Sequence, residues 1–517
     1  MATSHCNGVG RGRAVKRVLI ANRGEIAVRI VRACHEEGLE AVAVYSEADR
    51  LSPHVRAADL AVEIGPAPAS ESYLDIERIL AAARHTGADA IHPGYGFLAE
   101  RAVFAEAVEA AGLVFVGPSP AAIRAMGEKT EARRRMAEAG VPIIPGTTEP
   151  VAGVEAAVEA ASHVGYPVMV KAAAGGGGKG MRRADDAGAL RAVYRQAVSE
   201  ALSAFGDGAV YLERCIERPR HVEIQVVADG DGRTVHLGER ECSVQRRHQK
   251  LIEEAPSTAV DVDLRARMGD AAVRAAEAVG YRGAGTVEFL LEPDGRFYFL
   301  EMNTRIQVEH PVTELVYGVD LVREQLRIAA GQQHSITGTP LAPRGHAIEC
   351  RITSEDPANG FLPATGTVDY LHVPSGPGVR WDAGIEVGTS VGLHYDPLLA
   401  KLVVWAATRE RAIRRMARAL DELVISGVTT SQAFHRRVMA EPSFRAGRYD
   451  IRYIDDVGAR LLDAGPDPAD LEIAAVAAAL AEHERRRAPA ATAVRAPVDG
   501  GSPWTRSARL GALRWPR

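Results

Sequence analysis

The sequence predicts a mixed α/β (α+β) protein, and two observations carry that prediction. Between residue 17 and about residue 117, apolar strand-like runs alternate with helical patterns, as in a parallel sheet covered by helices. Further along, segment 286–309 holds two apolar runs separated by Asp294-Gly295, the strongest local signal for a β-hairpin. The length of 517 residues suggests about three domains of roughly 150 residues each.

The composition is that of a soluble globular protein and argues against several classes of function. Apolar residues make up 46% of the chain and charged residues 25%, with a net charge of −5, which gives no support for binding nucleic acid or a membrane. The five cysteines show neither zinc nor redox spacing. Because we find no apolar run of signal-peptide or membrane-span length, we expect a cytoplasmic protein.

The N-terminal α/β domain is expected over 17–128, after a Gly/Arg-rich tail at 1–16 that is predicted to be disordered. Residues 17–25 indicate a buried strand that enters a glycine turn, 26–38 a helix, and 41–46 a second strand. The loop at 92–98 follows a strand end, the usual place for ligands in such sheets.

A glycine-rich segment follows a predicted strand that ends on Lys171. Residues 119–140, which include Lys129, are predicted to be helical, and 166–171 form the strand before the glycines. Four consecutive glycines at 175–178 would let backbone N–H groups approach a phosphate. Lys179 is followed by Gly180, so this is not a Walker A loop. A flexible linker is the alternative, which the preceding lysine makes less attractive.

Strands are predicted at 210–213 and 221–227, followed by a dense polar stretch at 239–250. Its four cations, with Gln245, His248 and Gln249, could form an anion pocket. A solvated charge run is the alternative.

Lysine is rare in this chain, with only six among 62 basic residues. Three of the six lie in the glycine-rich and 245–250 segments. This supports the interpretation that these lysines occupy positions that need a compact point charge.

The hairpin at 286–309 predicts two opposed carboxylates. If Asp294-Gly295 is a two-residue turn, Glu288 faces Glu301 on one side of the ribbon. Opposed carboxylates repel unless a cation lies between them, and Mg²⁺ suits such oxygen ligands. Polar residues then recur at a spacing of two: Asn303, Arg305, Gln307 and Glu309. While the chain stays extended, they share one face; a half-buried strand with a solvated face is the alternative.

The rest of the chain is expected to hold a helix from 310 to about 331, a strand at 345–351, further strands to 404, and helices over 409–463. Arg351 ends its strand, where a lone arginine is usually a surface residue. From 464 onward a linker precedes an Ala-rich helix at 469–487 and a Pro/Ala/Gly tail.

Together these motifs resemble the biotin carboxylase subunits of the ATP-grasp superfamily, over roughly 17–460. The segments that carry the resemblance are 20–27, 92–98, 175–181, 220–225, 245–250, 283–289 and 301–314. The resemblance implies an ATP-grasp fold with an N-terminal Rossmann-like α/β domain. An ATP-grasp domain at 129–344 with a mobile lid at about 145–215 would follow, then a C-terminal domain at 345–463 and a linker helix with a tail at 464–517.

The implied reaction has two steps: Mg-ATP phosphorylates bicarbonate to carboxyphosphate, and the carboxyl group then moves to N1′ of biotin. The implied ligands of Mg²⁺ (or Mn²⁺) are Glu288, Glu301 and Asn303. The residues that the resemblance assigns to ATP are Lys129, Lys171, Gly176, Gly177, Gly178, Gly180, Met181, Glu213, His221, Gln245, His248, Glu288 and Glu301.

The residues assigned to bicarbonate and biotin are Lys250, Arg305, Gln307, Val308, Glu309 and Arg351. Arg305 can grip a planar anion with two hydrogen bonds, and Lys250 adds a second cation. Glu309 matches the family's general base. Arg351 matches the arginine that stabilises the biotin enolate, an assignment that rests on the resemblance alone.

None of the six lysines follows a methionine, so the chain is not expected to carry its own biotin. Either the biotin is on a separate carboxyl carrier protein or domain, or the sequence is a truncated one. A carboxyltransferase β subunit is the other expected partner, and the resemblance suggests a homodimer. Because the tail at 502–515 resembles the linker of larger acyl-CoA carboxylase α chains, we expect an acetyl- or propionyl-CoA carboxylase component.

Three alternatives remain open. The chain could serve a pyruvate, urea or methylcrotonyl-CoA carboxylase. It could be a non-catalytic structural subunit, which the chemically competent residue at every motif position disfavours. It could also be an ATP-grasp ligase that joins carboxylates to amines, which segments 245–250 and 305–309 disfavour.

Overall fold

The computed structural model describes residues 15–173, 181–338, 341–462 and 468–487. The chain divides into two units, Met1–Leu462 and Asp463–Arg517. In the second unit, the expected Ala-rich helix is present as α16 (Pro468–Arg487). The predicted tails at 1–14 and 488–517, and glycines Gly176, Gly177, Gly178 and Gly180, lie outside the described residues. Among those described, no helix combines the length and apolar content needed to cross a bilayer.

The N-terminal part is the predicted parallel α/β layer. The sheet order is β3 (Leu60–Gly65), β2 (Glu40–Ser46), β1 (Arg17–Ile20), β4 (Ala90–His92) and β5 (Val114–Phe115), with all neighbours parallel. The helices of this layer are α1 (Gly24–Glu36), α2 (Pro53–Ala57), α3 (Ile76–Thr86) and α4 (Ala102–Ala110). The apolar stripe of α1, which includes Ile26 and Ile30, is buried as its periodicity predicts.

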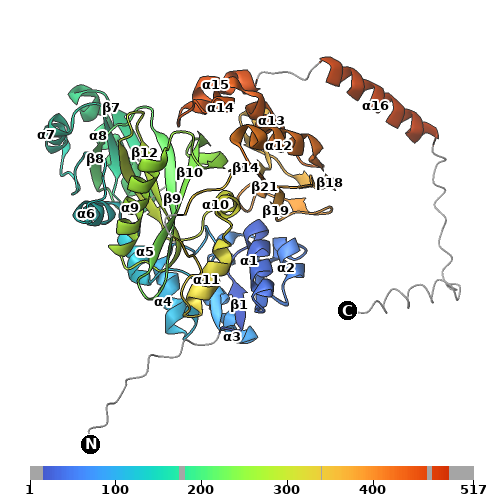
Figure 1. Cartoon of the computed structure of the whole chain (residues 1–517), viewed down its shortest axis with the longest axis horizontal. Coiled ribbons are helices and arrows are strands. Elements are labelled where there is room, and N and C mark those ends of the chain that lie inside the picture. Colours follow the sequence, from blue (N-terminus) through green and yellow to red (C-terminus); the bar gives the residue numbers. More distant parts are fainter. Residues whose placement is uncertain (1–14, 174–180, 339–340, 463–467, 488–517) are drawn as a thin grey trace, which may run out of the picture. The chain divides into compact units, whose positions relative to one another are not determined.

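A small antiparallel sheet forms a separate layer, drawn in teal in Figure 1. Its order is β7 (Met181–Ala184), β6 (Val168–Ala172) and β8 (Val210–Arg214). Helices α7 (Val154–Val164) and α8 (Ala187–Phe205) pack against it around a core of its own that contains Ala161, Val170 and Leu212. A layer with an independent core can move as a body, as the predicted lid requires.

An eight-stranded antiparallel sheet forms the centre of the protein. Its order is β13 (Phe297–Asn303), β12 (Gly283–Leu291), β9 (Arg220–Ala228), β10 (Thr234–Arg246), β11 (Gln249–Ala255), β14 (His346–Thr353), β21 (Leu398–Ala406) and β19 (Val379–Ala383). Because β11 pairs with β14, the sheet runs without interruption across the predicted domain boundary at 344/345.

The two faces of this sheet differ in chemistry. One face is apolar and packs under α9 (Val262–Glu277), α12 (Arg409–Glu422) and α13 (Gln432–Ala440). In β14, for example, Ile348, Cys350 and Ile352 belong to the core with α12 and α13. The alternate residues Glu349 and Arg351 therefore point to the opposite face, near α10 (His310–Tyr317). That opposite face holds the polar residues described below.

Two predicted helices are each broken into two. Segment 119–140 forms α5 (Pro120–Gly127) and α6 (Lys129–Glu138), because Glu128 between them is extended at φ −91° and ψ 110°. Segment 310–331 forms α10 and α11 (Leu321–Ala329), separated by Gly318 at φ +68°. Asp320 caps α11 by accepting a hydrogen bond from the backbone N–H of Arg323. Both predictions of a single helix were wrong.

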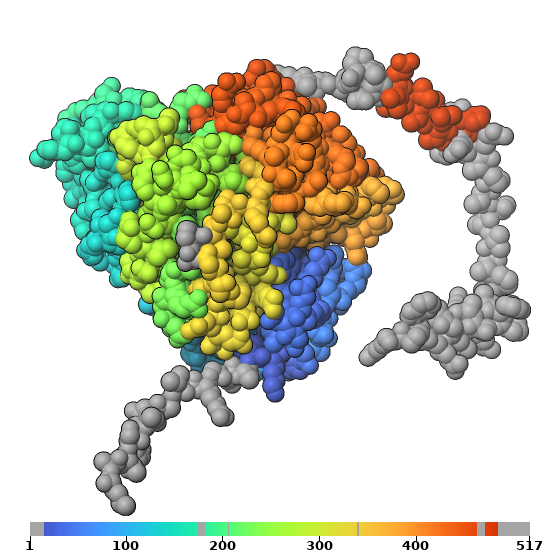
Figure 2. Space-filling view, viewed as in Figure 1, coloured from blue at the N-terminus to red at the C-terminus, as the bar shows by residue number. Residues whose placement is uncertain are grey.

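The N-terminal layer and the central sheet are in contact. α1 packs against α11 and against strands β19 and β21, and on the face shown in Figure 2 the blue N-terminal residues lie directly beside the yellow segment that holds α11. The remaining short elements are α14 (Pro442–Arg445), α15 (Tyr453–Leu462), β15 (Glu355–Asp356), β16 (Leu362–Pro363), β17 (Gly366–Thr367), β18 (Tyr370–His372), β20 (Ser390–Val391) and β22 (Val424–Ser426), with 3-10 turns at Glu47–Asp49, Ala69–Glu71 and Pro357–Asn359.

Candidate active site

The hairpin of β12 and β13 places Glu288 opposite Glu301, as predicted, although the turn differs from the prediction. The loop has three residues and is closed by the N–H of Glu292, which donates to the carbonyl of Arg296 at 2.8 Å. Gly295 supplies the left-handed position at φ +82°. A bulge at Leu300 then shifts the register back by one residue, so the two departures cancel at the carboxylates.

The polar residues after the hairpin converge on Glu288, although strand β13 ends at Asn303 and the following residues form bends and a turn. The expectation of one continuous extended face was therefore wrong beyond Asn303. Even so, Nδ2 of Asn303 donates to Oε1 of Glu288 at 2.9 Å, and Nε2 of Gln307 donates to the same oxygen at 2.8 Å. Turns thus bring together side chains that a strand would only have aligned.

Lys250 joins three carboxylates at the centre of the site. Its Nζ lies 2.6 Å from Oε2 of Glu223, 2.9 Å from Oε1 of Glu288 and 2.6 Å from Oε1 of Glu309. Burial lowers the pKa of this amine, but the three negative charges outweigh burial and raise it well above its usual range. Lys250 is therefore charged at neutral pH and holds the three strands and the 303–310 turn together.

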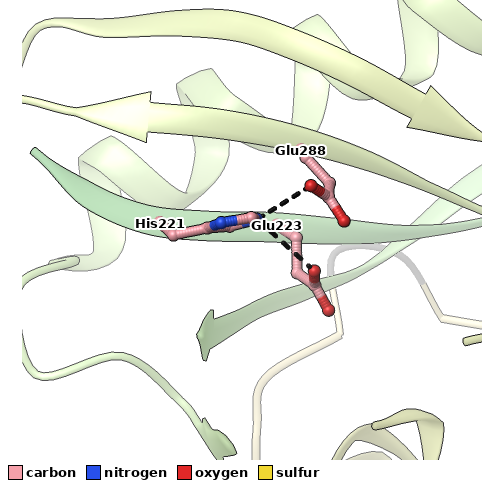
Figure 3. A group of neighbouring side chains, drawn as sticks. All are labelled: His221, Glu223 and Glu288. Carbon is pink, nitrogen blue, oxygen red and sulfur yellow. Dashed lines mark ion pairs between the residues drawn. The ribbon is translucent and has the colours of Figure 1, made fainter. Parts of the chain in front are cut away.

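Figure 3 shows His221 and Glu223 of β9 beside Glu288 of β12. Nε2 of His221 lies 2.9 Å from Oε2 of Glu288 and 3.9 Å from Oε2 of Glu223. Burial opposes the charge on Glu288, but Lys250 and His221 outweigh it and hold the pKa of Glu288 well below its usual value. One ligand atom from each of His221, Glu223 and Glu288 lies within 4.8 Å of the others, so these three side chains could hold a metal ion together.

The predicted metal ligands fit a divalent cation by chemistry. Glu288 and Glu301 are register partners, and both offer hard oxygen atoms. Glu301 is accessible to solvent. Even so, the surrounding protein raises the pKa of Glu301, and the negative charge of Glu288 raises it further. Oδ1 of Asn303 accepts a hydrogen bond from Arg305 at 2.8 Å.

Arg351 lies between two carboxylates. Its Nε donates to Oε1 of Glu253 at 2.6 Å, and one terminal nitrogen donates to Oε2 of Glu309 at 2.9 Å. Burial opposes ionisation of Glu309, but Lys250, Arg351 and Arg240 outweigh it and lower its pKa. Glu309 is therefore a carboxylate at neutral pH, the form that can accept a proton.

Arg305 is held by a residue from the N-terminal layer. Its Nε donates to Oε2 of Glu100 at 2.9 Å, while a terminal nitrogen binds Asn303. Glu100 follows the 92–98 loop, which the sequence predicted to be a ligand region. The guanidinium side chain is 19% exposed, so it lies at the rim of the cluster, where a small anion can reach it.

The second group of predicted nucleotide residues lies around Glu213 of β8. Glu213 forms ion pairs with Lys171 of β6 and with the buried Arg133 of α6. Lys129 begins α6; burial lowers its pKa, and the nearby charge of Glu301 acts in the opposite direction. The lid sheet, α6 and the hairpin therefore meet around these cations.

The remaining predicted residues are less closely tied to the cluster. Met181 begins β7 opposite Lys171. Gln245 is buried on β10 and donates to the carbonyl of Cys242 at 3.5 Å. His248 is exposed on the two-residue turn between β10 and β11, where both turn residues have positive φ. The sequence left two interpretations of segment 239–250, an anion pocket or a solvated charge run. The exposed turn fits the solvated run, whereas Lys250 extends into the interior.

Arg240 is a functional candidate that the sequence analysis missed. It is fully buried, and its guanidinium donates to Glu223, Gln225, Thr286, Gln307 and Thr313 at 2.6–3.0 Å. The partners span β9, β12, the 303–310 turn and α10, so Arg240 cross-links the elements that carry the site. A single arginine in a charge-rich stretch gives no local sign of such a position.

Glu223, Glu253 and Glu100 were missed as well. For Glu223 a signal existed, because it lies two residues from His221 on a predicted strand and therefore shares its face. Glu349 has the same relation to Arg351. For Glu100 and Glu253 only tertiary contacts reveal the role.

The chain was compared with known families and structures. Residues 14–123 match the model for the biotin carboxylase N-terminal domain, 128–337 that for the carbamoyl-phosphate synthase L chain ATP-binding domain, and 349–456 that for the biotin carboxylase C-terminal domain. Biotin carboxylase 1 of Bacillus subtilis is 52% identical over 442 residues, which is 85% of this chain and 98% of that protein.

Two further relatives come from carboxylases with other acceptors. One pyruvate carboxylase subunit from Methanothermobacter thermautotrophicus is 51% identical over 440 residues, which is 85% of this chain and 89% of that protein. The biotin carboxylase domain dimer of 2-oxoglutarate carboxylase from Hydrogenobacter thermophilus, solved with MgADP, ADP and bicarbonate, has a TM-score of 0.83 at 45% identity. That match covers 88% of this chain and 100% of that one.

The fold and the carboxylate-rich site define an ATP-dependent ligase with the ATP-grasp fold. At the identities and coverage given above, the chain belongs to the biotin carboxylase family. It is an ATP-dependent biotin carboxylase, as the sequence motifs predicted, and the non-catalytic and carboxylate–amine ligase alternatives have no support.

Proposed function

We propose that the chain carboxylates biotin on a separate carrier protein, with Mg-ATP and bicarbonate, as the biotin carboxylase component of an acetyl- or propionyl-CoA carboxylase. The observation that carries the proposed site is the convergence of Lys250, Glu309 and Arg351, a proton acceptor held between two cations. The proposed domain boundaries are those of the sequence analysis, with catalysis on the polar face of the central sheet.

In the first step, Lys129 and Lys171 would bind the phosphates of ATP from the side of the lid. Glu288, Glu301 and Asn303 would hold the metal ion, which supplies positive charge for the phosphoryl group during transfer. His221 and Glu223 lie close enough to Glu288 to share this task or to orient its carboxylate. The proposed lid at about 145–215 would close over the site and exclude water from carboxyphosphate.

Bicarbonate would bind to Arg305, whose planar guanidinium matches a planar anion, with Lys250 as a second cation. Glu309 would remove its proton, since it is ionised and already bonded to Lys250. The carboxylates of the cluster, taken alone, would repel the bicarbonate anion. Lys250 and Arg351, on either side of Glu309, offset this repulsion and make the approach of bicarbonate favourable.

In the second step, Arg351 would stabilise the negative charge that develops on the ureido oxygen of biotin. Gln307 and Val308 would line the same pocket. The backbone carbonyl of Val308 accepts a hydrogen bond from the buried Lys401 at 2.9 Å, which fixes the 303–310 turn beneath the bound biotin.

The final acceptor of the carboxyl group is inferred from the C-terminal tail of the sequence. Support for an acyl-CoA carboxylase comes from the tail motif at 502–515. A second candidate is a pyruvate carboxylase component, because such a protein is as similar to this chain as the biotin carboxylases are. In either assembly the proposed partners are a biotin carboxyl carrier protein and a carboxyltransferase β subunit. A homodimer is proposed by analogy with the dimer solved for a relative.

The test has two stages. Purified protein with Mg²⁺ should hydrolyse ATP only when bicarbonate is present, and faster with free biotin. Addition of a biotinylated carrier and a carboxyltransferase should then yield a carboxylated product from acetyl-CoA or propionyl-CoA. A product from pyruvate alone would replace the acyl-CoA assignment, and ATP hydrolysis that ignores bicarbonate would refute the proposed chemistry.

A further inference from the structure

A second pair of opposed carboxylates lies behind the proposed catalytic residues. Glu253 of β11 and Glu349 of β14 are direct register partners across the antiparallel ladder. Both residues have no solvent exposure. Directly opposed side chains in an antiparallel pair lie about 5 Å apart at Cβ, so the two carboxyl groups share one buried space.

The hydrogen bonding of this pair is incomplete. Oε1 of Glu253 accepts from Arg351 at 2.6 Å. Within the described part of the chain, Oε2 of Glu253 and both carboxylate oxygens of Glu349 have no hydrogen-bond partner. A buried ionised carboxylate without a donor is strongly unfavourable, whereas a neutral acid can donate its own proton to a neighbouring oxygen.

A nearby pair in the same sheet shows what complete hydrogen bonding of two buried carboxyl groups requires. Glu241 of β10 and Glu254 of β11 are also register partners and are also buried. Glu241 accepts bonds from Arg220, Ser243 and Ser257, and Glu254 accepts from Arg409, Tyr449 and His346. Every carboxylate oxygen of the Glu241–Glu254 pair has a hydrogen-bond donor. In the Glu253–Glu349 pair, within the described residues, only one oxygen has a donor.

The charged groups around Glu349 do not supply the missing donors. They are Glu253 on β11, Arg351 on its own strand, Lys401 on β21 and Glu309 before α10, while Lys250 on β11 acts on Glu253. Nζ of Lys401 is directed to the carbonyl of Val308 at 2.9 Å and to Glu25 of α1 at 3.2 Å. On α10, burial lowers the pKa of His310 well below its usual range, so that ring adds no charge.

We propose that Glu253 and Glu349 hold a single proton between them, with Glu349 as the neutral acid, and that this pair positions Arg351 for catalysis. The inference rests on the role assigned to Arg351 under the proposed function. Glu253, ionised, then holds Nε of Arg351 at 2.6 Å, and the terminal Nη2 lies between the two carboxylates, 2.6 Å from Glu253 and 2.9 Å from Glu309. Neither glutamate touches substrate in this arrangement, so both are positioning residues.

The direction of the pKa shifts agrees with this assignment. Burial raises the pKa of Glu253 to about 7, although Arg351 opposes the shift. Burial also raises the pKa of Glu349, well above its usual range, although Lys401 opposes it, and Glu253 adds to the rise. When the shared proton is lost at high pH, a third carboxylate competes with Glu309 for the guanidinium, and turnover should fall.

The variants Glu349→Gln and Glu253→Gln separate the two halves of the pair. An amide is neutral and can donate, so E349Q should keep kcat within about twofold at neutral pH and lose any alkaline fall that the pair causes. E253Q should lower kcat at least tenfold with the KM for ATP unchanged, because only the hold on Arg351 is lost. Glu241→Gln, a buried carboxylate of the same sheet with complete bonding, is the matched control and should keep kcat.

Infrared spectroscopy of the full chain gives a readout that does not depend on turnover. A neutral carboxylic acid has its own C=O stretching band, so the wild type at neutral pH should show a band of this kind that is missing from the spectrum of E349Q and is lost as the pH is raised. Absence of the band in the wild type overturns the shared proton, and so does a kcat loss in E349Q as large as that in E253Q. If E349Q does not fold, the wild-type band and its pH dependence decide alone.

Arg351→Lys distinguishes a failure of this inference from a failure of the proposed function. If R351K is impaired and E253Q is not, the positioning role is overturned and the role of Arg351 stands. If R351K turns over normally, the assignment of Arg351 in the proposed function is wrong, and the positioning role is overturned with it.

Discussion

Glu309→Gln tests the centre of the proposed chemistry. The substitution keeps size and shape but removes a negative charge that lies 2.6 Å from Lys250 and 2.9 Å from Arg351. A positioned general base contributes about 10²–10⁴-fold to a rate, which corresponds to about 3–5 kcal/mol of activation free energy. We therefore expect bicarbonate-dependent kcat to fall by that factor.

Stability should change much less than turnover. Lys250 keeps its contacts with Glu223 and Glu288, and Arg351 keeps Glu253, so neither cation is left unpaired. The cost should stay below the roughly 3–5 kcal/mol that follows from stranding a buried charge. The KM for ATP should be nearly unchanged, because Glu309 does not contact the lysines assigned to the phosphates.

The assay is the initial rate of ATP hydrolysis with Mg²⁺, with and without bicarbonate, together with thermal unfolding. Glu239→Gln is the matched control: Glu239 is buried on β10 and bonded to Arg265 at 2.7 Å, but it lies on the opposite face from Arg240. It should lower stability and leave kcat unchanged. Wild-type turnover in E309Q would remove Glu309 as the base.

Three further predictions concern other parts of the structure. Glu288→Gln should raise the Mg²⁺ concentration needed for half-maximal ATP hydrolysis at least tenfold; an unaltered metal titration would contradict the opposed-carboxylate argument. Arg305→Lys should raise the KM for bicarbonate at least tenfold and spare that for ATP, since lysine cannot form the paired bonds; equal effects on both substrates would contradict an anion site. Arg409 and His346 help lower the pKa of buried Glu254 to about 2 from 4.5 despite burial, so its charge should stabilise the fold by about 3 kcal/mol above pH 4.5. That contribution should disappear as the pH falls toward 2; Glu254→Gln should therefore lower the unfolding free energy at pH 7 but change it little near pH 2, and a pH-independent difference would exclude this linkage.

The hairpin shows how far local sequence rules reach. Alternation and the Asp294-Gly295 signal were sufficient to pair Glu288 with Glu301. They did not reveal that the loop has three residues or that Leu300 forms a bulge. Both features depend on how the strands twist and pack, and each shifts the register by one. A rule based on the turn alone reached the correct pairing because the two errors cancelled.

Helix breaks were partly readable in advance. Tyr317-Gly318 followed by Asp320 combines a glycine end signal with an N-cap residue, and the structure ends α10 and begins α11 there. The break before α6 carries a weaker sign: Gly127 ends α5, but the following Glu128 is a good helix former and not a preferred N-cap residue. It places Lys129 at the first turn of α6, so a position important to the site is set by tertiary structure.

Two of the missed residues share a physical property. Arg240 and Glu253 are charged groups with no solvent exposure, whereas charged residues usually lie at the surface. Their burial is possible only because partners arrive from strands distant in the sequence, as Glu223 does for Arg240. Sequence alone reveals the residue type but not the partner, so such networks escape local rules.

The alternation of the central sheet explains why catalysis and stability are separable in this fold. On β14, Ile348, Cys350 and Ile352 pack into the core beneath α12 and α13, while Glu349 and Arg351 face the polar cluster. Burial of the apolar face stabilises the fold. This stabilisation offsets the free energy that is lost when the polar groups of the opposite face are buried. Because both faces belong to the same strands, the core also fixes the spacing of Glu253, Arg351 and Lys401 across neighbouring strands. The positions of the reacting groups are therefore set by the packing of residues that never contact a substrate.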